Sequence, residues 1–189
     1  MADGETGGRA KFHAMTEGTQ EDWGNIIQAT RAFSAEFPDR LLSHLKLLEG
    51  DCGGFAVDRM EHSLQTATRA EEAGASDEVV VASLCHDIGK AVSVMNHPMI
   101  AAEILRPYVS GDTYQMIRAH QDFQGKHYYE YLGQDPDARD KYVGQPWYGL
   151  AEQFADEWDQ TSFDPDYPTK PLSHFEPLVR QVFATPRSF

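Results

Sequence analysis

Several features that would place this chain in a common protein class are scarce. Its 189 residues include two cysteines, Cys52 and Cys85, which are too few for a disulfide framework and indicate reduced thiols in the cytoplasm. No apolar run reaches the roughly 20 residues of a membrane span, and we expect no signal peptide. Basic residues are outnumbered, with 16 Lys and Arg against 30 Asp and Glu and a net charge of −14. We therefore expect neither nucleic acid nor a membrane as a partner.

The sequence also lacks alternating strand patterns and internal repeats, and its apolar residues recur at three- and four-residue steps instead. This spacing predicts an all-α fold, in which residues 20–189 form one helical bundle behind a mobile tail, residues 1–19. A loop is expected where prolines accumulate, at 162–171, and an irregular aromatic region at 123–147. Helices are expected at 20–36, 39–48, 57–73, 77–87, 97–109, 110–122, 147–158 and 173–183.

The most informative stretch is residues 86–90, His-Asp-Ile-Gly-Lys, which follows a strongly apolar helix. Burying an imidazole beside a carboxylate is costly unless a partner compensates both, and a metal ion is the usual partner. Other histidines are similarly spaced along the chain: His86 follows His62 by 24 residues, and His120 follows His97 by 23 residues. Each gap spans about two helices, so these side chains can return to one level of a bundle.

The chain offers six nitrogen and oxygen donors for such a site: His62, His86, Asp87, His97, His120 and Asp159. A closed zinc site needs four ligands, so six suit two metal ions that share a carboxylate, and Asp87 is the natural bridge. The lack of a thiolate favours iron or manganese over structural zinc. A single histidine is more often a surface or core residue than a ligand, which is how we interpret the other four, His13, His44, His127 and His174.

This donor set resembles the signature of the HD-domain superfamily, and the third and fourth histidines resemble those of its two-metal members. More narrowly, residues 60–67 and 158–160 resemble the first and last ligand helices of the mixed-valent diiron oxygenases of that superfamily. The likeness covers roughly residues 41–183, and the nearest members are the phosphonate-degrading oxygenases. The resemblance implies an α-helical fold, two iron ions in an Fe(II)/Fe(III) state, and O2 as co-substrate.

The sequence departs from the members that act on 2-amino-1-hydroxyethylphosphonate. They place a Tyr ten residues and a Glu seven residues before the first ligand His, where this chain has Cys52 and Phe55. Phe55 cannot pair with a primary ammonium, but its ring face can hold a quaternary one. Aromatic neighbours such as Trp158 could add rings, although each alone is more often core. The resemblance then implies oxidative C–P cleavage of (1-hydroxy-2-(trimethylammonio)ethyl)phosphonate to glycine betaine and phosphate.

Four further residues are candidate substrate contacts. Lys90 is expected at the rim, where relatives carry a phosphonate contact, and Lys126 matches a second family lysine only if two residues are inserted. For either lysine, a solvated surface side chain is the alternative. Cys52 is either a lid or weak metal contact, or a small buried loop residue. Asp156, one turn before Asp159, is either a substitute ligand or faces the cationic end of the substrate.

Two other function classes remain open at this point. A metal-dependent phosphohydrolase is the commoner activity of HD proteins, and Lys90 would suit it; such an enzyme would turn over without O2, using Mn or Mg. A binding or regulatory domain with a degenerate site is the other, and the intact set of six donors argues against it. Oligomeric state is left undetermined by the sequence.

Overall fold

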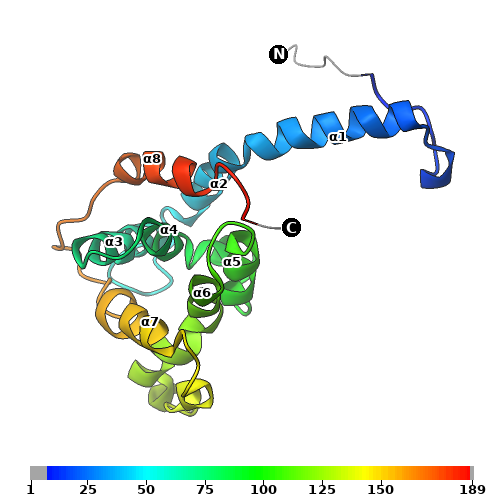
Figure 1. Ribbon diagram of the computed structural model, residues 1–189. Coiled ribbons are helices and arrows are strands. Elements are labelled where there is room, and N and C mark those ends of the chain that lie inside the picture. The colour runs from blue at the N-terminus through cyan, green and yellow to red at the C-terminus, as the bar shows by residue number, and fades with distance from the viewer. Residues whose placement is uncertain (1–7, 188–189) are drawn as a thin grey trace.

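The computed structural model describes residues 8–187, and all the regular secondary structure in that range is helical, with no strand (Figure 1). This confirms the predicted all-α fold. The described range contains eight α-helices, with 3-10 turns between some of them: α1 (Gln20–Ala35), α2 (Phe37–Leu45), α3 (Arg59–Glu72), α4 (Asp77–Cys85), α5 (His97–Leu105), α6 (Gly111–Gln124), α7 (Tyr148–Gln153) and α8 (Leu172–Val182). None of the helices in residues 8–187 is both long and apolar enough to cross a bilayer.

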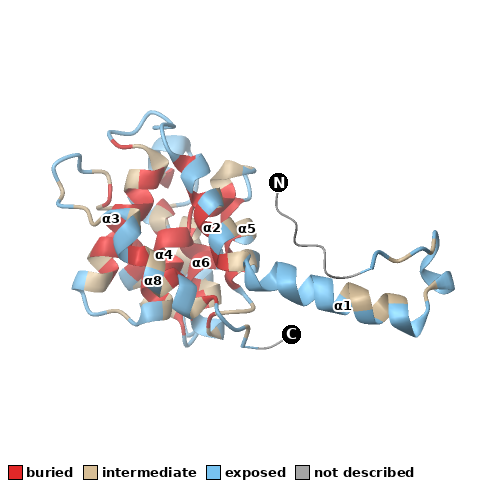
Figure 2. Ribbon diagram, turned by 90° about the horizontal axis from the view of Figure 1, so that it is seen from above, coloured by how far each residue is buried: buried red, intermediate tan, exposed pale blue. Residues whose placement is uncertain are grey.

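Helix α4 forms the centre of the body because nearly all of its surface is apolar. Every residue from Val79 to Cys85 is buried, and α3, α6 and α8 pack around the helix. A helix that is hydrophobic on all sides must be enclosed in this way. Figure 2 shows the buried residues concentrated around α4 and α6. The end of α4 therefore delivers residues 86 and 87 into the interior.

Helix boundaries follow local capping chemistry more closely than apolar spacing. Helix α3 begins two residues later than predicted, because the Asp58 side chain caps it by accepting a hydrogen bond from the Glu61 amide at 2.8 Å. Helix α5 ends four residues early, at Leu105, because Pro107 has no backbone N–H to continue the hydrogen-bond ladder. Helix α4 also ends early, at Cys85, and a 3-10 turn at Ile88–Ala91 follows.

Helix α1 is the exception to this packing. It forms where the spacing predicts, with a capping box between Thr19 and Asp22, but it projects from the body and contributes no buried residue to the described structure (Figures 1 and 2). Its apolar stripe faces solvent, with Ile27 51% and Phe33 62% exposed. The expected place of α1 in the bundle is therefore wrong. Of the predicted mobile tail, residues 1–7 lie outside the described residues, and residues 8–19 contain a 3-10 turn, Met15–Glu17.

Candidate metal centre

The first group of donors is formed by His62, His86 and Asp159. The Nε2 atoms of the two histidines lie 3.1 Å apart, and Asp159 Oδ1 lies 3.2 Å from His62 Nε2 and 3.6 Å from His86 Nε2. A fourth atom, Asp87 Oδ2, lies 3.6 Å from each of the two nitrogens. Separations near 3 to 4 Å are those expected of ligands around one ion whose bonds are about 2.1 Å long.

The second group of donors uses the other oxygen of the same aspartate. His97 Nε2 and His120 Nε2 lie 3.2 Å apart, and Asp87 Oδ1 lies 3.1 Å from the first and 3.7 Å from the second. Each Asp87 oxygen thus faces a different pair of histidines. The structure brings all six predicted donors together, and Asp87 lies between the two groups, where the sequence placed the bridge.

Hydrogen bonds fix which nitrogen of each imidazole faces inward. All four Nδ1 atoms lie within hydrogen-bonding distance of backbone carbonyls, so we assign them the ring proton: His62 to Ser162 (2.9 Å), His86 to Ser83 (2.7 Å), His97 to Val94 (2.8 Å) and His120 to Ile117 (2.7 Å). Each Nε2 then presents a lone pair to the centre. Asp87 Oδ1 and Asp159 Oδ2 are buried without a hydrogen-bond partner among residues 8–187. Lone pairs and carboxylates facing one another need cations, so the donor set fits two metal ions.

Burial and charge set the protonation states of these groups. Burial lowers the pKa of His86 to about 4 and also lowers the pKa of His97, so both imidazoles are neutral near pH 7. Burial opposes ionisation of Asp87, but the charge of His86, which is protonated only at the acidic pH where Asp87 titrates, and the charge of Lys90 outweigh burial and hold the pKa of Asp87 well below its usual range. His62 differs, because its hydrogen bond with Asp159 overcomes burial and raises the pKa. A metal ion and a proton would therefore compete for His62 Nε2.

Local backbone features place the ligands. Gly89 allows the turn after Asp87 to approach α5 closely, since a Cβ atom at Gly89 would lie 2.4 Å from the His97 carbonyl oxygen. Asp159 ends a π-helical segment, Phe154–Asp159, a conformation that is frequent at functional sites. Gln124, one turn after His120 on α6, donates a hydrogen bond to Asp159 Oδ1 at 2.8 Å. In the sequence, the only sign of the contact between Gln124 and Asp159 is that Gln124 lies one helical turn after His120, on the same face.

A small cavity of about 190 Å³ opens beside the donors, and its walls include Cys52, Phe55, Asp58, His62, Asp87 and Lys90. Three of the predicted substrate contacts, Cys52, Phe55 and Lys90, therefore share one cavity. Lys90 Nζ lies 2.5 Å from Asp87 Oδ2, and its side chain is 22% exposed, so it joins the metal centre to the cavity mouth. Cys52 is an exposed free thiol, not a buried loop residue.

Phe163 also lines this cavity, and sequence reasoning missed it. Its ring stacks on His62 at 4.3 Å between centroids and on Phe55 at 4.7 Å, with interplanar angles of 15° and 21°. Phe163 therefore lies between the two other rings, and Phe55, which is 59% exposed, also lines the cavity. The only signal in the sequence was an aromatic residue four places after Asp159.

Three other predicted substrate contacts are not brought to this cavity. Lys126 is at the surface, where it forms an ion pair with Asp137 at 2.6 Å. Trp158 is buried in the core against Phe154.

Asp156 instead binds Arg139 Nη1 through both carboxylate oxygens, at 3.0 Å each, and lies 2.9 Å from His127 Nε2. The π-helical turn places Asp156 and Asp159 on different faces, which removes Asp156 from the ligand set. Asp156 thus anchors the irregular region 125–145.

The buried histidines and aspartates that face one another in this all-helical fold form groups that could hold metal ions. The family model described as HD domain matches residues 59–162, more than half of the chain, and the protein belongs to the HD-domain family. A comparison with curated proteins returned no match. Members of this family are usually metal-dependent enzymes, and the His/Asp cluster agrees with that class.

Proposed function

We propose that the protein is an O2-dependent oxygenase with two iron ions that cleaves the C–P bond of (1-hydroxy-2-(trimethylammonio)ethyl)phosphonate. The observation that carries this proposal is the division of donors around Asp87, whose two oxygens face separate histidine pairs. One ion would use only the first group and leave His97 and His120 without a role. All six donors are nitrogen or oxygen, a set that suits iron.

The cavity beside the centre supports a small zwitterionic substrate. Its volume of about 190 Å³ is below the range of drug-sized pockets, roughly 300–1,000 Å³. Lys90 uses one of its three N–H donors on Asp87 among the described residues, so others can bind a phosphonate oxygen. The ring of Phe55, exposed and part of the cavity wall, can contact a trimethylammonium group through cation–π attraction. In a protein of net charge −14, this local cation is what an anionic substrate requires.

In the proposed reaction, C1 loses its hydrogen and its bond to phosphorus, and the products glycine betaine and phosphate contain every atom of the substrate and of one O2. The overall reaction therefore needs no external reductant. His62, His86, Asp87, His97, His120 and Asp159 would hold the iron ions, which supply the one-electron chemistry that O2 requires. Lys90 would orient the phosphonate, and Phe55 would fix the ammonium end. Together they direct C1 toward the centre.

Phosphate release with and without O2 tests this proposal. Iron-loaded protein should release phosphate from the trimethylated substrate only in air, and more slowly from 2-amino-1-hydroxyethylphosphonate. Equal rates for the two substrates would remove the role of Phe55. Phosphate release from a small phosphate ester under nitrogen, with Mn or Mg, would instead identify a phosphohydrolase at the same cavity.

A further inference from the structure

The loop between the π-helical segment and α8 holds one metal-binding candidate on two sides. The carbonyl of Ser162 accepts a hydrogen bond from His62 Nδ1 at 2.9 Å, and the ring of Phe163 stacks on the His62 imidazole at 4.3 Å. The hydrogen bond to Ser162 limits rotation of the imidazole within its own plane, and stacking on Phe163 fixes the orientation of that plane. Neither residue is a metal-binding candidate, yet together they determine where His62 Nε2 points.

Helix α3 holds this loop in place through a buried side chain one turn after His62. Gln65 is fully buried, donates a hydrogen bond to the Asp164 carbonyl at 2.7 Å, and accepts one from the Asp164 amide at 3.3 Å. The amide group thus pairs with both backbone groups of the residue after Phe163. Because the Gln65 side chain is buried, losing one of these hydrogen bonds would leave its amide group unsatisfied, which proteins avoid.

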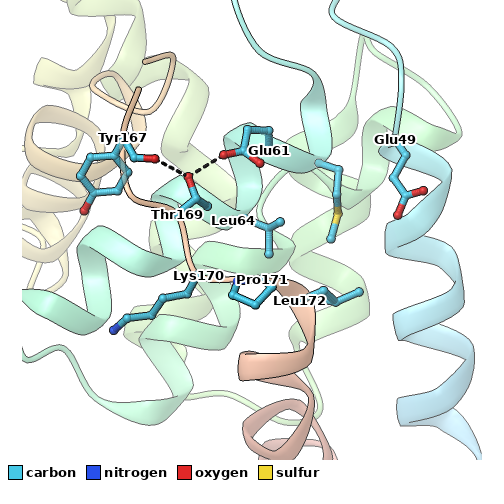
Figure 3. Close-up of a pocket in the computed structure, with 9 residues that line it drawn as sticks. Glu49, Glu61, Leu64, Tyr167, Thr169, Lys170, Pro171 and Leu172 are labelled. Atoms are coloured by element: carbon cyan, nitrogen blue, oxygen red, sulfur yellow. Dashed lines mark hydrogen bonds between the residues drawn. The ribbon is translucent and has the colours of Figure 1, made fainter. Parts of the chain in front are cut away.

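Further contacts from α3 extend along the same loop. Arg69 donates to the Thr161 carbonyl at 3.0 Å, and the Lys170 amide donates to Thr68 Oγ1 at 3.1 Å. Figure 3 shows the Thr169 hydroxyl bonded to Glu61, at 2.5 Å. These hydrogen bonds run along α3 on both sides of Gln65, so the loop is held over its whole length. Gln65 is the member nearest to Phe163.

We infer that Gln65 and Phe163 are positioning residues of the metal centre: Gln65 fixes the loop, and the loop fixes the His62 imidazole between Phe163 and the Ser162 carbonyl. This inference does not depend on whether the reaction is oxidative or hydrolytic. It predicts an asymmetric effect, because the loop touches the donors His62 and Asp159 but not the pair His97 and His120. Loss of either residue should weaken metal binding at the first group and spare the second.

Metal binding measured with Mn(II) alone separates positioning from general stability. Phe163→Leu keeps an apolar side chain without the planar ring, and Gln65→Glu keeps the size of the side chain without its N–H donors. Each should bind the ion at His62, His86 and Asp159 about 10- to 100-fold more weakly, the range typical for loss of a residue that orients a ligand. At a metal concentration that fills both positions of the wild type, each variant should hold one ion. Its electron paramagnetic resonance spectrum should change from a coupled pair to an isolated Mn(II).

Two further variants make the result specific. Phe163→Tyr retains the ring and should retain both ions. Tyr167 is on the same loop, and the centre of its ring lies 3.7 Å from the Arg69 guanidinium carbon. Tyr167→Leu removes this ring and should leave metal binding unchanged. Melting temperatures of the metal-free proteins, measured in parallel, show that each variant folds.

Retention of two tightly bound ions in folded Phe163→Leu and Gln65→Glu would overturn the inference. So would an equal loss of affinity in Tyr167→Leu, which would show that any weakening of the loop has the same effect. If the wild type binds one ion only, the proposed two-ion centre fails, and the positioning role is then judged by the affinity of the same variants for that ion.

Discussion

The metal centre and the cavity beside it lie next to each other but differ in how firmly their residues are held. The six donors are at most 4% exposed, and each imidazole is fixed through Nδ1 by a backbone carbonyl. In the cavity, Phe55 is 59% exposed and Cys52 is a free surface thiol. Buried polar groups must have partners, whereas exposed ones can be solvated. Substitution of a donor in the centre should therefore abolish metal binding, whereas substitution of a cavity residue should change substrate affinity gradually.

Replacing the shared aspartate should produce the largest effect. Asp87→Ala removes an oxygen from each donor group, so metal affinity should fall at least about 100-fold and activity should be lost with it. Metal content per chain after dialysis checks this. Asp156→Ala is the matched control, because Asp156 pairs with Arg139 and His127 instead, and this variant should keep its metal. Full metal content in Asp87→Ala would contradict the proposed bridge.

Removal of the cavity lysine should have the next largest effect. Lys90→Ala deletes the cation of the cavity wall that pairs with Asp87, and should raise the KM for the phosphonate roughly 10-fold or more, as expected for a charge-assisted hydrogen bond. Lys126→Ala should change KM by less than about twofold, since an exposed ion pair contributes little. Steady-state kinetics compare the two variants. A larger effect from Lys126 would restore the role that the sequence predicted for it.

A smaller and more selective effect is expected at the aromatic wall. Phe55→Ala should raise the KM for the trimethylated substrate about 2- to 30-fold, which corresponds to the roughly 0.5–2 kcal/mol of a cation–π contact. It should leave the KM for the primary amine nearly unchanged. Phe33→Ala, which removes another exposed ring on the projecting α1, serves as the control. Equal effects of Phe55→Ala on both substrates would show that the ring does not select the ammonium group.

The smallest expected effect concerns the reactivity of the two thiols and does not involve catalysis. Burial raises the pKa of Cys85 to about 12, so its thiol should resist alkylation, while exposed Cys52 should react. Mass spectrometry of the folded protein should therefore find one modified thiol per chain. Bound substrate should slow the labelling, because Cys52 lines the cavity. Modification of both thiols in the folded protein would contradict the packing around α4.

The same contrast explains how far the sequence could be interpreted. Apolar spacing predicted α4 and its position at the centre, and the cost of burying His86 beside Asp87 indicated a metal site. Spacing could not reveal the π-helical turn that separates Asp156 from Asp159, because that turn depends on tertiary packing. Phe163 was missed for a similar reason, since its partners lie about a hundred positions earlier in the chain.

The surface was harder to predict than the interior. Lys126 satisfied a family pattern only by an assumed insertion, and the structure pairs it with Asp137. Helix α1 has an apolar stripe of the right spacing, yet the described chain supplies nothing to cover Phe33 apart from the Arg40 guanidinium, 3.6 Å from the centre of its ring. Periodicity identifies a helix, but whether the stripe is buried depends on the neighbours that the fold provides.

Anomalous scattering at the iron edge, from crystals of the protein loaded with iron under nitrogen, tests the central claim most directly. The account predicts two peaks per chain, one on each side of the Asp87 carboxylate, with His62, His86 and Asp159 around the first and His97 and His120 around the second. A single peak, or two peaks of which one lies away from His97 and His120, would contradict it.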